Sequence, residues 1–295
     1  MKNVSSFSDL STEIQECVNA CTIYLNEFIK SNIATPTIDV TSKNITIIGN
    51  GIAQEVDSFL FNITASAFVI FINITLSGLL TNIKIINPPD SGLISIQNSY
   101  LQFENSIVNP SDSFLYSGIH SFSSSLNIRN SSFIYNGTKE NNPRLGGAIF
   151  MVEGNLYIES SNFEFNSANS GGALNVFDCR NVIINQSTFK NNKATSTGGG
   201  AVFLSNTTAN FNYINASSNL AGSEGNFNSF GGWLMIRAES KVDISNLDCR
   251  SNSAMNGGCI SVLELSALVI RIFNYKINIK FTNRYFTSCL LLSFN

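Results

Sequence analysis

The sequence predicts an all-β protein, a solenoid in which short strands coil repeatedly around one apolar core. Three observations support this prediction: pairs of glycines that recur every 25 to 32 residues, segments of nearly constant length that follow each pair, and apolar residues at alternate positions within these segments. Such self-similarity is typical of repeat proteins, in which each repeat buries its apolar face against its neighbours. The pairs are Gly146–Gly147, Gly171–Gly172, Gly199–Gly200, Gly231–Gly232 and Gly257–Gly258.

The N-terminal residues have a helical pattern instead, and residues 1–30 are predicted to form a cap. The apolar series at helical spacing is Leu10, Ile14, Cys17 or Val18, Cys21 and Leu25, with Asp9 and Ser11 as cap candidates. A short capping helix would cover the first strand edge, which otherwise invites pairing with other chains. Thr22–Ile23–Tyr24–Leu25 fits a first strand equally well, and in that case the helix ends near Ala20.

Each glycine pair is followed by a predicted strand. Counting the first glycine as zero, positions 3 and 5 are apolar in all five repeats, whereas position 4 is mixed. This alternation indicates a strand with one face in the core. Position 3 holds Ile149, Leu174, Val202, Leu234 and Ile260, and position 5 holds Met151, Val176, Leu204, Ile236 and Val262. Stacking of successive turns would therefore pile each column inside a parallel β-helix, which we predict over residues 31–280.

An asparagine follows the first glycine of each pair after 20 or 21 residues. These asparagines are Asn166, Asn192, Asn219, Asn252 and Asn278, and Asn136 before the first pair belongs to the same series; an aromatic residue stands three positions earlier in four cases (Phe133, Phe163, Phe189, Tyr275). We predict that these asparagine amides hydrogen-bond from turn to turn. The glycine pairs are predicted to form tight bends with positive φ and no room for a Cβ atom.

The motifs Gly146–Gly147–Ala148–Ile149, Gly171–Gly172–Ala173–Leu174 and Phe163–Glu164–Phe165–Asn166 resemble the GGA[ILV] and FxxN repeats of polymorphic outer membrane proteins. The resemblance covers roughly residues 130–280 and extends to large surface proteins of protists. It implies a single right-handed parallel β-helix with the pectin lyase-like fold. Because members of that family are mostly adhesins or antigens, the resemblance implies the fold more strongly than any activity.

Two repeats depart from this pattern. Trp233 and Cys259 replace the motif alanine, while Ala216 and Cys249 stand where the phenylalanine should be. Ile214 and Leu247 are expected to take the place of the aromatic residue in the core. Trp233 either packs beneath the longer segment 220–230 or, if it points outward, stacks on a sugar ring.

Composition excludes several classes of function. Charged residues make up 13% and the net charge is −3, which removes the electrostatic case for binding nucleic acid or an anionic membrane. The single histidine, His120, excludes a multi-histidine metal site and is expected at the surface or a corner. The stretch 59–86 is the most apolar, but asparagines interrupt it, so buried strands are favoured over a membrane span.

The six cysteines include no C-x-x-C pair, which excludes a zinc ribbon or a thioredoxin-type motif. Cys17 and Cys21, four residues apart on the predicted helix, could form a disulfide only with distortion, so buried free thiols are favoured. The disulfide state of the others, Cys179, Cys249, Cys259 and Cys289, stays open. Nine N-x-S/T sequons permit a secreted glycoprotein: Asn3, Asn44, Asn62, Asn73, Asn130, Asn136, Asn185, Asn206 and Asn215.

No catalytic, cofactor-binding or metal-binding residue is assigned. Asn246–Leu247–Asp248 has the N-x-D shape of polygalacturonase-like enzymes, but the other motifs of those enzymes are missing. A calcium-dependent lyase would have to use scattered residues, with Asp243, Asp248 and Glu264 as ligands and Arg250 or Arg271 as base. Glu153, Asp178 and Glu264 each lie seven residues after a glycine pair begins, and we interpret this column as a polar corner, with weak metal binding as the alternative.

The sequence therefore favours a non-catalytic module of a secreted or cell-surface protein, acting in adhesion, recognition or as a structural rod. Its expected partners are glycans or other surface proteins. The alternative is a polysaccharide lyase or glycosidase, which a groove with three or more converging charged groups would favour over a smooth polar wall. Residues 281–295 are expected to be irregular and lack a polar cap, which indicates a fragment of a larger protein whose membrane attachment lies in other parts.

Overall fold

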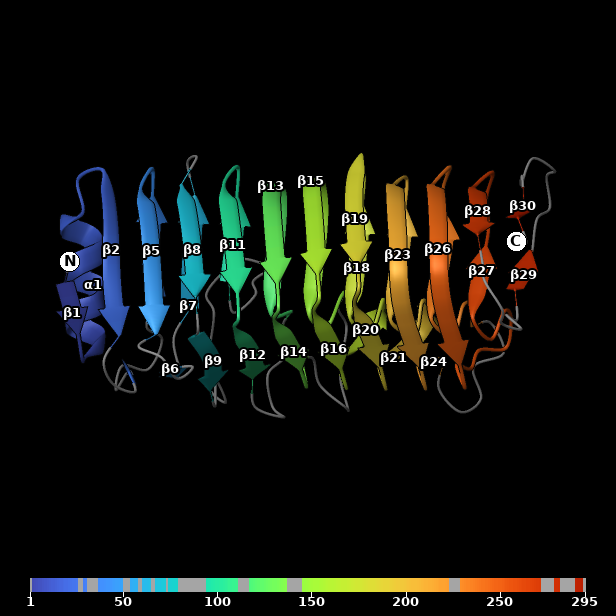
Figure 1. The fold of residues 1–295 in the computed structure, drawn as a ribbon, viewed down its shortest axis with the longest axis horizontal. Coiled ribbons are helices and arrows are strands. Elements are labelled where there is room, and N and C mark those ends of the chain that lie inside the picture. Colours follow the sequence, from blue (N-terminus) through green and yellow to red (C-terminus); the bar gives the residue numbers. More distant parts are fainter. Residues whose placement is uncertain are drawn as a thin grey trace.

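The chain forms a single right-handed parallel β-helix in the computed structural model (Figure 1), which confirms the predicted fold class. The structure describes residues 2–25, 29–30, 37–49, 54–57, 60–64, 67–72, 74–78, 94–110, 117–136, 145–222, 229–271, 279–281 and 290–293. Within these ranges the strands pair in parallel register along three faces of the coil.

The first face is the row of strands seen side by side along the coil in Figure 1. Its strands pair in the order β2 (Ala20–Leu25), β5 (Asn44–Gly49), β8 (Phe68–Ile72), β11 (Tyr100–Glu104), β13 (Ile119–Arg129), β15 (Ile149–Glu159), β19 (Asn181–Asn185), β23 (Thr208–Ser217), β26 (Lys241–Arg250), β28 (Ala267–Arg271) and β30 (Leu290–Ser293).

Two further faces complete each turn. The second consists of β4 (Thr37–Thr41), β7 (Leu60–Thr64), β10 (Ile94–Gln97), the first halves of β13 and β15, β18 (Leu174–Phe177), β22 (Val202–Ser205), β25 (Leu234–Arg237), β27 (Ile260–Val262) and β29 (Ile279–Phe281). The third consists of β3 (Ile29–Lys30), β6 (Gln54–Asp57), β9 (Ile74–Gly78), β12 (Ile107–Pro110), β14 (Ser132–Ile134), β16 (Asn162–Glu164), β20 (Thr188–Lys190) and the last parts of β23 and β26. A small separate sheet contains β17 (Ser167–Ser170), β21 (Lys193–Gly198) and β24 (Leu220–Ala221).

The N-terminal helix α1 (Phe7–Glu16) lies at the N-terminal end of the coil (Figure 1), where β1 (Lys2–Val4) pairs with β2. Its N-cap is Ser6, whose Oγ accepts the N–H of Asp9 at 3.1 Å, rather than Asp9 or Ser11 as expected. The helix ends four residues before Ala20. The later residues of the apolar series belong to β2, because the chain there pairs with β5.

The prediction of free thiols at Cys17 and Cys21 is wrong, since the two residues form a disulfide. The prediction placed both residues on one helix. Because α1 ends at Glu16 and β2 has begun before Cys21, the intervening bend brings their Cα atoms to 6.0 Å, a separation that suits a disulfide.

The predicted core column is confirmed. Ile149, Leu174, Val202, Leu234 and Ile260 are paired in register on successive strands of the second face, and all are buried. Position 4 is also largely buried, although its side chains point away from the core. Its residues Asn175, Phe203, Met235 and Ser261 are buried. The segment before the glycine pair covers Asn175, whose Nδ2 donates to Ser170 O at 2.9 Å.

The glycine pairs have the predicted role. The first glycine of each pair has φ between 60° and 70°, where a side chain is strained. In the first four pairs a Cβ atom on the second glycine would overlap the backbone of the next turn: on Gly172 it would overlap the carbonyl oxygen of Gly200. Neither position of these four pairs accepts another residue without movement of the backbone.

The predicted asparagine ladder is confirmed from Asn136 to Asn252. In each step the side-chain Nδ2 donates to Oδ1 of the next asparagine, at 2.8, 2.9, 2.9 and 2.8 Å. The same Oδ1 also accepts the backbone N–H of the preceding asparagine. Tyr275 and Asn278, which would extend the series, lie outside the described residues.

Two further ladders are made by serine and were not predicted. Ser106, Ser131, Ser161 and Ser187 form one, in which each backbone N–H donates to Oγ of the next serine at 3.1 to 3.2 Å. A second, interrupted ladder includes the step from Ser99 to Ser124, at 3.1 Å, and resumes near the C-terminal end. Each ladder residue follows a residue with positive φ, which turns the next side chain inward, where a buried N–H needs an acceptor.

The two departures from the repeat pattern compensate each other within the core. Phe189 is in register with Ala216, and the ring of Trp233 lies 6.4 Å from that of Phe189, so the large and small residues have exchanged places. In the next turn Cys249 replaces the phenylalanine and Cys259 replaces the alanine, and the two form a disulfide.

This arrangement corrects the expectation for Ile214 and Leu247. Both are buried, but they lie two positions before Ala216 and Cys249, where they pair with each other and continue the column of serines. The volume of the missing aromatic ring is therefore filled by Trp233 in one turn and by the disulfide in the next.

Strand pairing continues into the segment expected to be irregular, since β30 lies within residues 281–295 and pairs with β28. The apolar stretch 59–86 contributes β7, β8 and β9 to the coil, as the prediction of buried strands required. Among the described residues, no helix has the length and apolar character needed to span a membrane.

Candidate functional site

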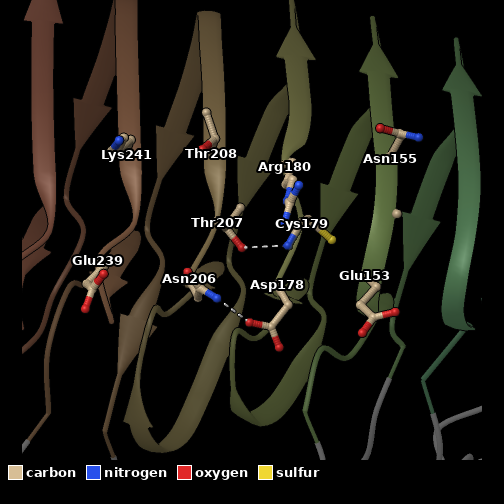
Figure 2. A pocket seen from close by; sticks show the side chains of 11 residues that line it. Glu153, Asn155, Asp178, Cys179, Arg180, Asn206, Thr207, Thr208, Glu239 and Lys241 are labelled. Atoms are coloured by element: carbon tan, nitrogen blue, oxygen red, sulfur yellow. Dashed lines mark hydrogen bonds between the residues drawn. The ribbon is translucent and has the colours of Figure 1, made fainter.

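A polar groove lies on the corner where the second face turns into the first, along four successive turns of the coil (Figure 2). Its volume is about 870 Å³. The lining residues are Glu153, Gly154, Asn155, Asp178, Cys179, Arg180, Asn206, Thr207, Thr208, Glu239 and Lys241. Figure 2 shows the carboxylates along one edge and Arg180 and Lys241 in a second row above them.

One-residue insertions place two of the charged groups at this corner. Strand register pairs Ser205 with Arg237 and Thr208 with Lys241, so the later turn has one more residue between these points. That extra residue creates two successive positions with positive φ, Ala238 and Glu239. The acidic column was predicted at the seventh residue after the first glycine of each pair. In this turn that residue is Ala238, so the spacing did not reveal Glu239.

Arg180 comes from a similar insertion. Register pairs Val152 with Phe177 and Asn155 with Asn181, which leaves one extra residue in the turn that contains Arg180. Insertions at a corner do not disturb the stacked strands, because they bulge into solvent. The groove is therefore formed at a corner where single-residue insertions change which side chains face solvent.

Two carboxylates of the groove are held by hydrogen bonds. Ser123 Oγ donates to Glu153 Oε2 at 2.6 Å, and Asn206 Nδ2 donates to Asp178 Oδ1 at 2.6 Å. Glu264, the third member of the predicted acidic column, does not line the groove. It forms an ion pair with Arg237, with Arg237 Nη2 donating to Oε1 at 2.8 Å.

Five charged side chains thus line one groove rather than a smooth neutral wall. Glu153, Asp178 and Glu239 contribute three negative charges, and Arg180 and Lys241 contribute two positive charges, so the sum is −1. All three carboxylates are exposed to solvent. The arrangement offers many hydrogen-bond donors and acceptors to a polar ligand, but no water-excluded pocket for chemistry.

Cys179 lies beneath the groove and is fully buried, with Sγ donating to Phe177 O at 3.3 Å. Burial raises the pKa of its thiol to about 12, and the negative charges of Asp178 and Glu153 act in the same direction. A thiol with so high a pKa is a poor nucleophile at neutral pH. Cys179 is therefore a structural residue of the groove floor.

The candidate residues of a calcium-dependent lyase are not brought together. Asp243 pairs with Arg271, and Asp248 pairs with Arg250 at 2.7 Å. Both arginines proposed as bases are thus bound to the proposed ligands. In the described part of the chain, no group of three His, Cys, Asp or Glu residues is arranged to hold a metal ion.

His120 and Trp233 are both buried. His120 was expected at the surface or a corner, but it lies in β13 with its ring 4.7 Å from that of Phe122 and 4.8 Å from that of Phe150. The prediction is wrong because position 4, which His120 shares in register with Phe150, is covered rather than exposed. Of the two alternatives for Trp233, stacking on a sugar ring is excluded, because the side chain is buried with its ring near those of Phe189 and Phe211. Residues 223–228 of the segment expected above it lie outside the described residues.

A second, mostly apolar hollow of about 460 Å³ adjoins the groove on the first face. It shares Arg180, Thr208 and Lys241 with the groove. Ile183 and Val269 are among the apolar residues that line it. A ligand in the groove would therefore meet an apolar surface next to the polar rows.

Comparison with known proteins adds little to this picture. No protein-family model matches the chain, and no curated protein matches it. Among solved structures, the SRRP of L. reuteri 53608 is 13% identical, covers 100% of this chain and 99% of its own, and has a TM-score of 0.40. The fold assignment rests on the strand register described above.

Proposed function

We propose that this chain is a non-catalytic module of a secreted or cell-surface protein, a rigid rod whose corner groove binds a neutral glycan. The observation on which this depends is the groove itself, in which four successive turns each present hydrogen-bonding side chains to the same side. We also propose kinship with the surface proteins that have GGA[ILV] and FxxN repeats. The motif residues support it, because they form the bends, the core and the ladder of the coil.

The rod role is supported by the internal bonding of the coil. Three corners contain ladders of buried hydrogen bonds, and the phenylalanine rings of successive turns stack at 5.0 to 5.1 Å. Close-packed repeats of this kind resist bending, because each turn contacts its neighbours over its whole length. The two disulfides, Cys17–Cys21 and Cys249–Cys259, support a location outside the reducing cytosol.

The charge of the groove favours a neutral glycan over an acidic one. A polyuronate would bring negative charge to a groove whose own charges sum to −1, and the repulsion would oppose binding. Carboxylate, amide and hydroxyl groups instead suit sugar hydroxyls, each of which both donates and accepts a hydrogen bond. The adjoining apolar hollow suits the less polar faces of sugar rings.

Titration calorimetry with neutral polysaccharides and with polyuronates tests the proposal. Arg180→Ala should weaken binding of a neutral glycan about 10-fold or more, since a hydrogen bond to a charged group contributes about 1.5–3 kcal/mol. Arg129→Ala is the matched control, because Arg129 lies on the first face outside the groove and pairs with Glu159. Equal affinities of the two variants, or binding of polyuronates alone, would refute the proposal.

A second candidate is a carbohydrate-active enzyme, because five charged side chains converge in one groove, which is the arrangement expected to favour an enzyme, and Glu153 and Asp178 place two carboxylates on adjacent turns. Glycosidases use such a pair, with one carboxyl group buried so that it stays protonated as the acid. The exposure of both side chains argues against this role. Release of reducing ends from a glycan panel, abolished by Asp178→Asn while binding persists, would establish the enzyme instead.

A further inference from the structure

The structure separates the N-x-S/T sequons by the exposure of their asparagines. Asn136 is fully buried and Asn185 is half-buried. The exposed asparagines are Asn3, Asn44, Asn130, Asn206 and Asn215, while the side chains of Asn62 and Asn73 lie outside the described part. Sequons of equal quality in the sequence therefore differ in whether a sugar could be attached to them in the folded protein.

Asn136 has no room for a sugar. Its Nδ2 donates to Asn166 Oδ1 at 2.8 Å and lies 3.3 Å from the carbonyl oxygens of both Val108 and Ile134. N-glycosylation replaces one of the two hydrogens of Nδ2 and requires space for a sugar at that atom. At this buried position it would open the first step of the asparagine ladder.

At three other sequons the asparagine side chain is exposed to solvent, unlike that of Asn136. Asn130 lies at a corner, with φ of 45°, directly before the buried ladder residue Ser131. Asn215 points outward from β23, and Asn44 begins β5. At these positions a sugar on Nδ2 would extend into solvent and leave the strand pairing and ladders unchanged.

Asn206 is exposed too, but its Nδ2 already donates to Asp178 Oδ1 in the groove. A glycan there would occupy the groove itself.

We propose that this protein carries N-linked glycans at Asn44, Asn130 and Asn215 and none at Asn136. In the transfer, Nδ2 forms a bond to the anomeric carbon of a lipid-linked oligosaccharide. The bond from that carbon to the pyrophosphate breaks, the lipid pyrophosphate leaves, and Nδ2 loses one proton. The disulfides are consistent with passage through an oxidising compartment, where such donors act.

Glycopeptide mapping of the protein secreted by its own cells tests the proposal. Enzymatic removal of N-glycans in ¹⁸O-labelled water converts each used asparagine to a labelled aspartate, which mass spectrometry locates. We expect the label at the three exposed positions and its absence from Asn136. Label at Asn136 in the folded protein, or its absence from all three exposed positions, would overturn the proposal.

Variants that remove a sequon but keep its asparagine provide matched controls. Ser132→Ala and Ser217→Ala should each lower the intact mass by one glycan, because they end the sequons of Asn130 and Asn215. Thr138→Ala ends the sequon of Asn136 and should leave the mass of the glycan complement unchanged. These outcomes do not depend on the groove, so they are distinct from the test of glycan binding.

Discussion

Replacement of Asn192 by alanine tests the physical basis of the coil. Its Oδ1 accepts the backbone N–H and the Nδ2 of Asn166, at 3.0 and 2.9 Å, and its Nδ2 donates to Phe163 O and Asn219 Oδ1, both at 2.9 Å. The side chain is buried, so water cannot replace these partners in the variant without entering the core. At about 1 kcal/mol for each of the four hydrogen bonds, Asn192→Ala should lower the free energy of unfolding by about 4 kcal/mol.

Equilibrium unfolding in urea measures this loss with two signals. Far-ultraviolet circular dichroism follows the strands, and fluorescence follows Trp233, the single tryptophan of the chain, which is buried near the ladder. Coincidence of the two transitions is required before a single free energy is assigned, because long repeat arrays can unfold in steps. A loss of about 4 kcal/mol is a large part of the free energy of unfolding of a typical folded protein, which is about 5–15 kcal/mol.

Two other asparagines calibrate the result. Asn210→Ala removes an exposed amide and should change stability by about 0.5 kcal/mol or less. Asn252→Ala removes a ladder residue that is only half-buried, and its effect should lie between the other two. If Asn192→Ala were no more destabilising than Asn210→Ala, the ladder would not stabilise the coil and the reasoning would be refuted.

Three further perturbations follow from the structure. Gly171→Ala should destabilise by about 2 kcal/mol or more in urea unfolding, because a Cβ atom there overlaps the Leu174 carbonyl in a backbone with φ of 60°. Trp233→Ala should cost about 3–5 kcal/mol, and Ala216→Phe should restore part of it by returning the large residue to its usual column. Cys179 should resist alkylation in the folded protein. Since its pKa is higher folded than unfolded, stability should fall as pH rises from about 9 towards 12, by at most about 4 kcal/mol.

Each of these predictions has its own control. The difference in stability between Ser218→Gly and Ser218→Ala gives the cost of a Cβ atom at a similar φ of 55° at an exposed site, so the excess loss in Gly171→Ala measures the overlap. Ala216→Phe with Trp233 retained should destabilise the protein through overpacking, because Trp233 already fills the space beside Ala216. A stabilising effect would contradict this account of the core. Cys179→Ser should reduce the alkaline loss of stability but not abolish it, because burial also raises the pKa of Tyr157. An unchanged loss in Cys179→Ser would contradict the assignment to Cys179.

The core of the fold was predictable because it depends on properties that each residue carries by itself. Apolar columns, glycines that tolerate positive φ and asparagines with paired donor and acceptor groups recur at constant spacing, and stacking converts that spacing into contact. The serine ladders escaped prediction because serine is common throughout the chain. Only the positive φ of the preceding residue marks which serines turn inward.

The candidate site was less predictable, because it depends on corners rather than on the repeat. Glu153 and Asp178 could be placed in one column by counting, but a count fails wherever one turn gains a residue. Glu239 and Arg180 are positioned by such insertions, which become visible only when the register of both flanking strands is known. Similarly, the disulfide Cys249–Cys259 joins two residues that each looked like an isolated departure from the motif.

By itself, the sequence determined that the chain is a parallel β-helix, which residues line its core, and where its bends and asparagine ladder lie. The tertiary structure alone decided which outward positions are covered, as for His120, where the helix ends and allows Cys17 to reach Cys21, and which charges share a groove. The physical reason is that stacking in register follows from a repeated local pattern. The burial of an outward side chain and the meeting of corner residues depend instead on how non-repeated segments of different length fold over the coil.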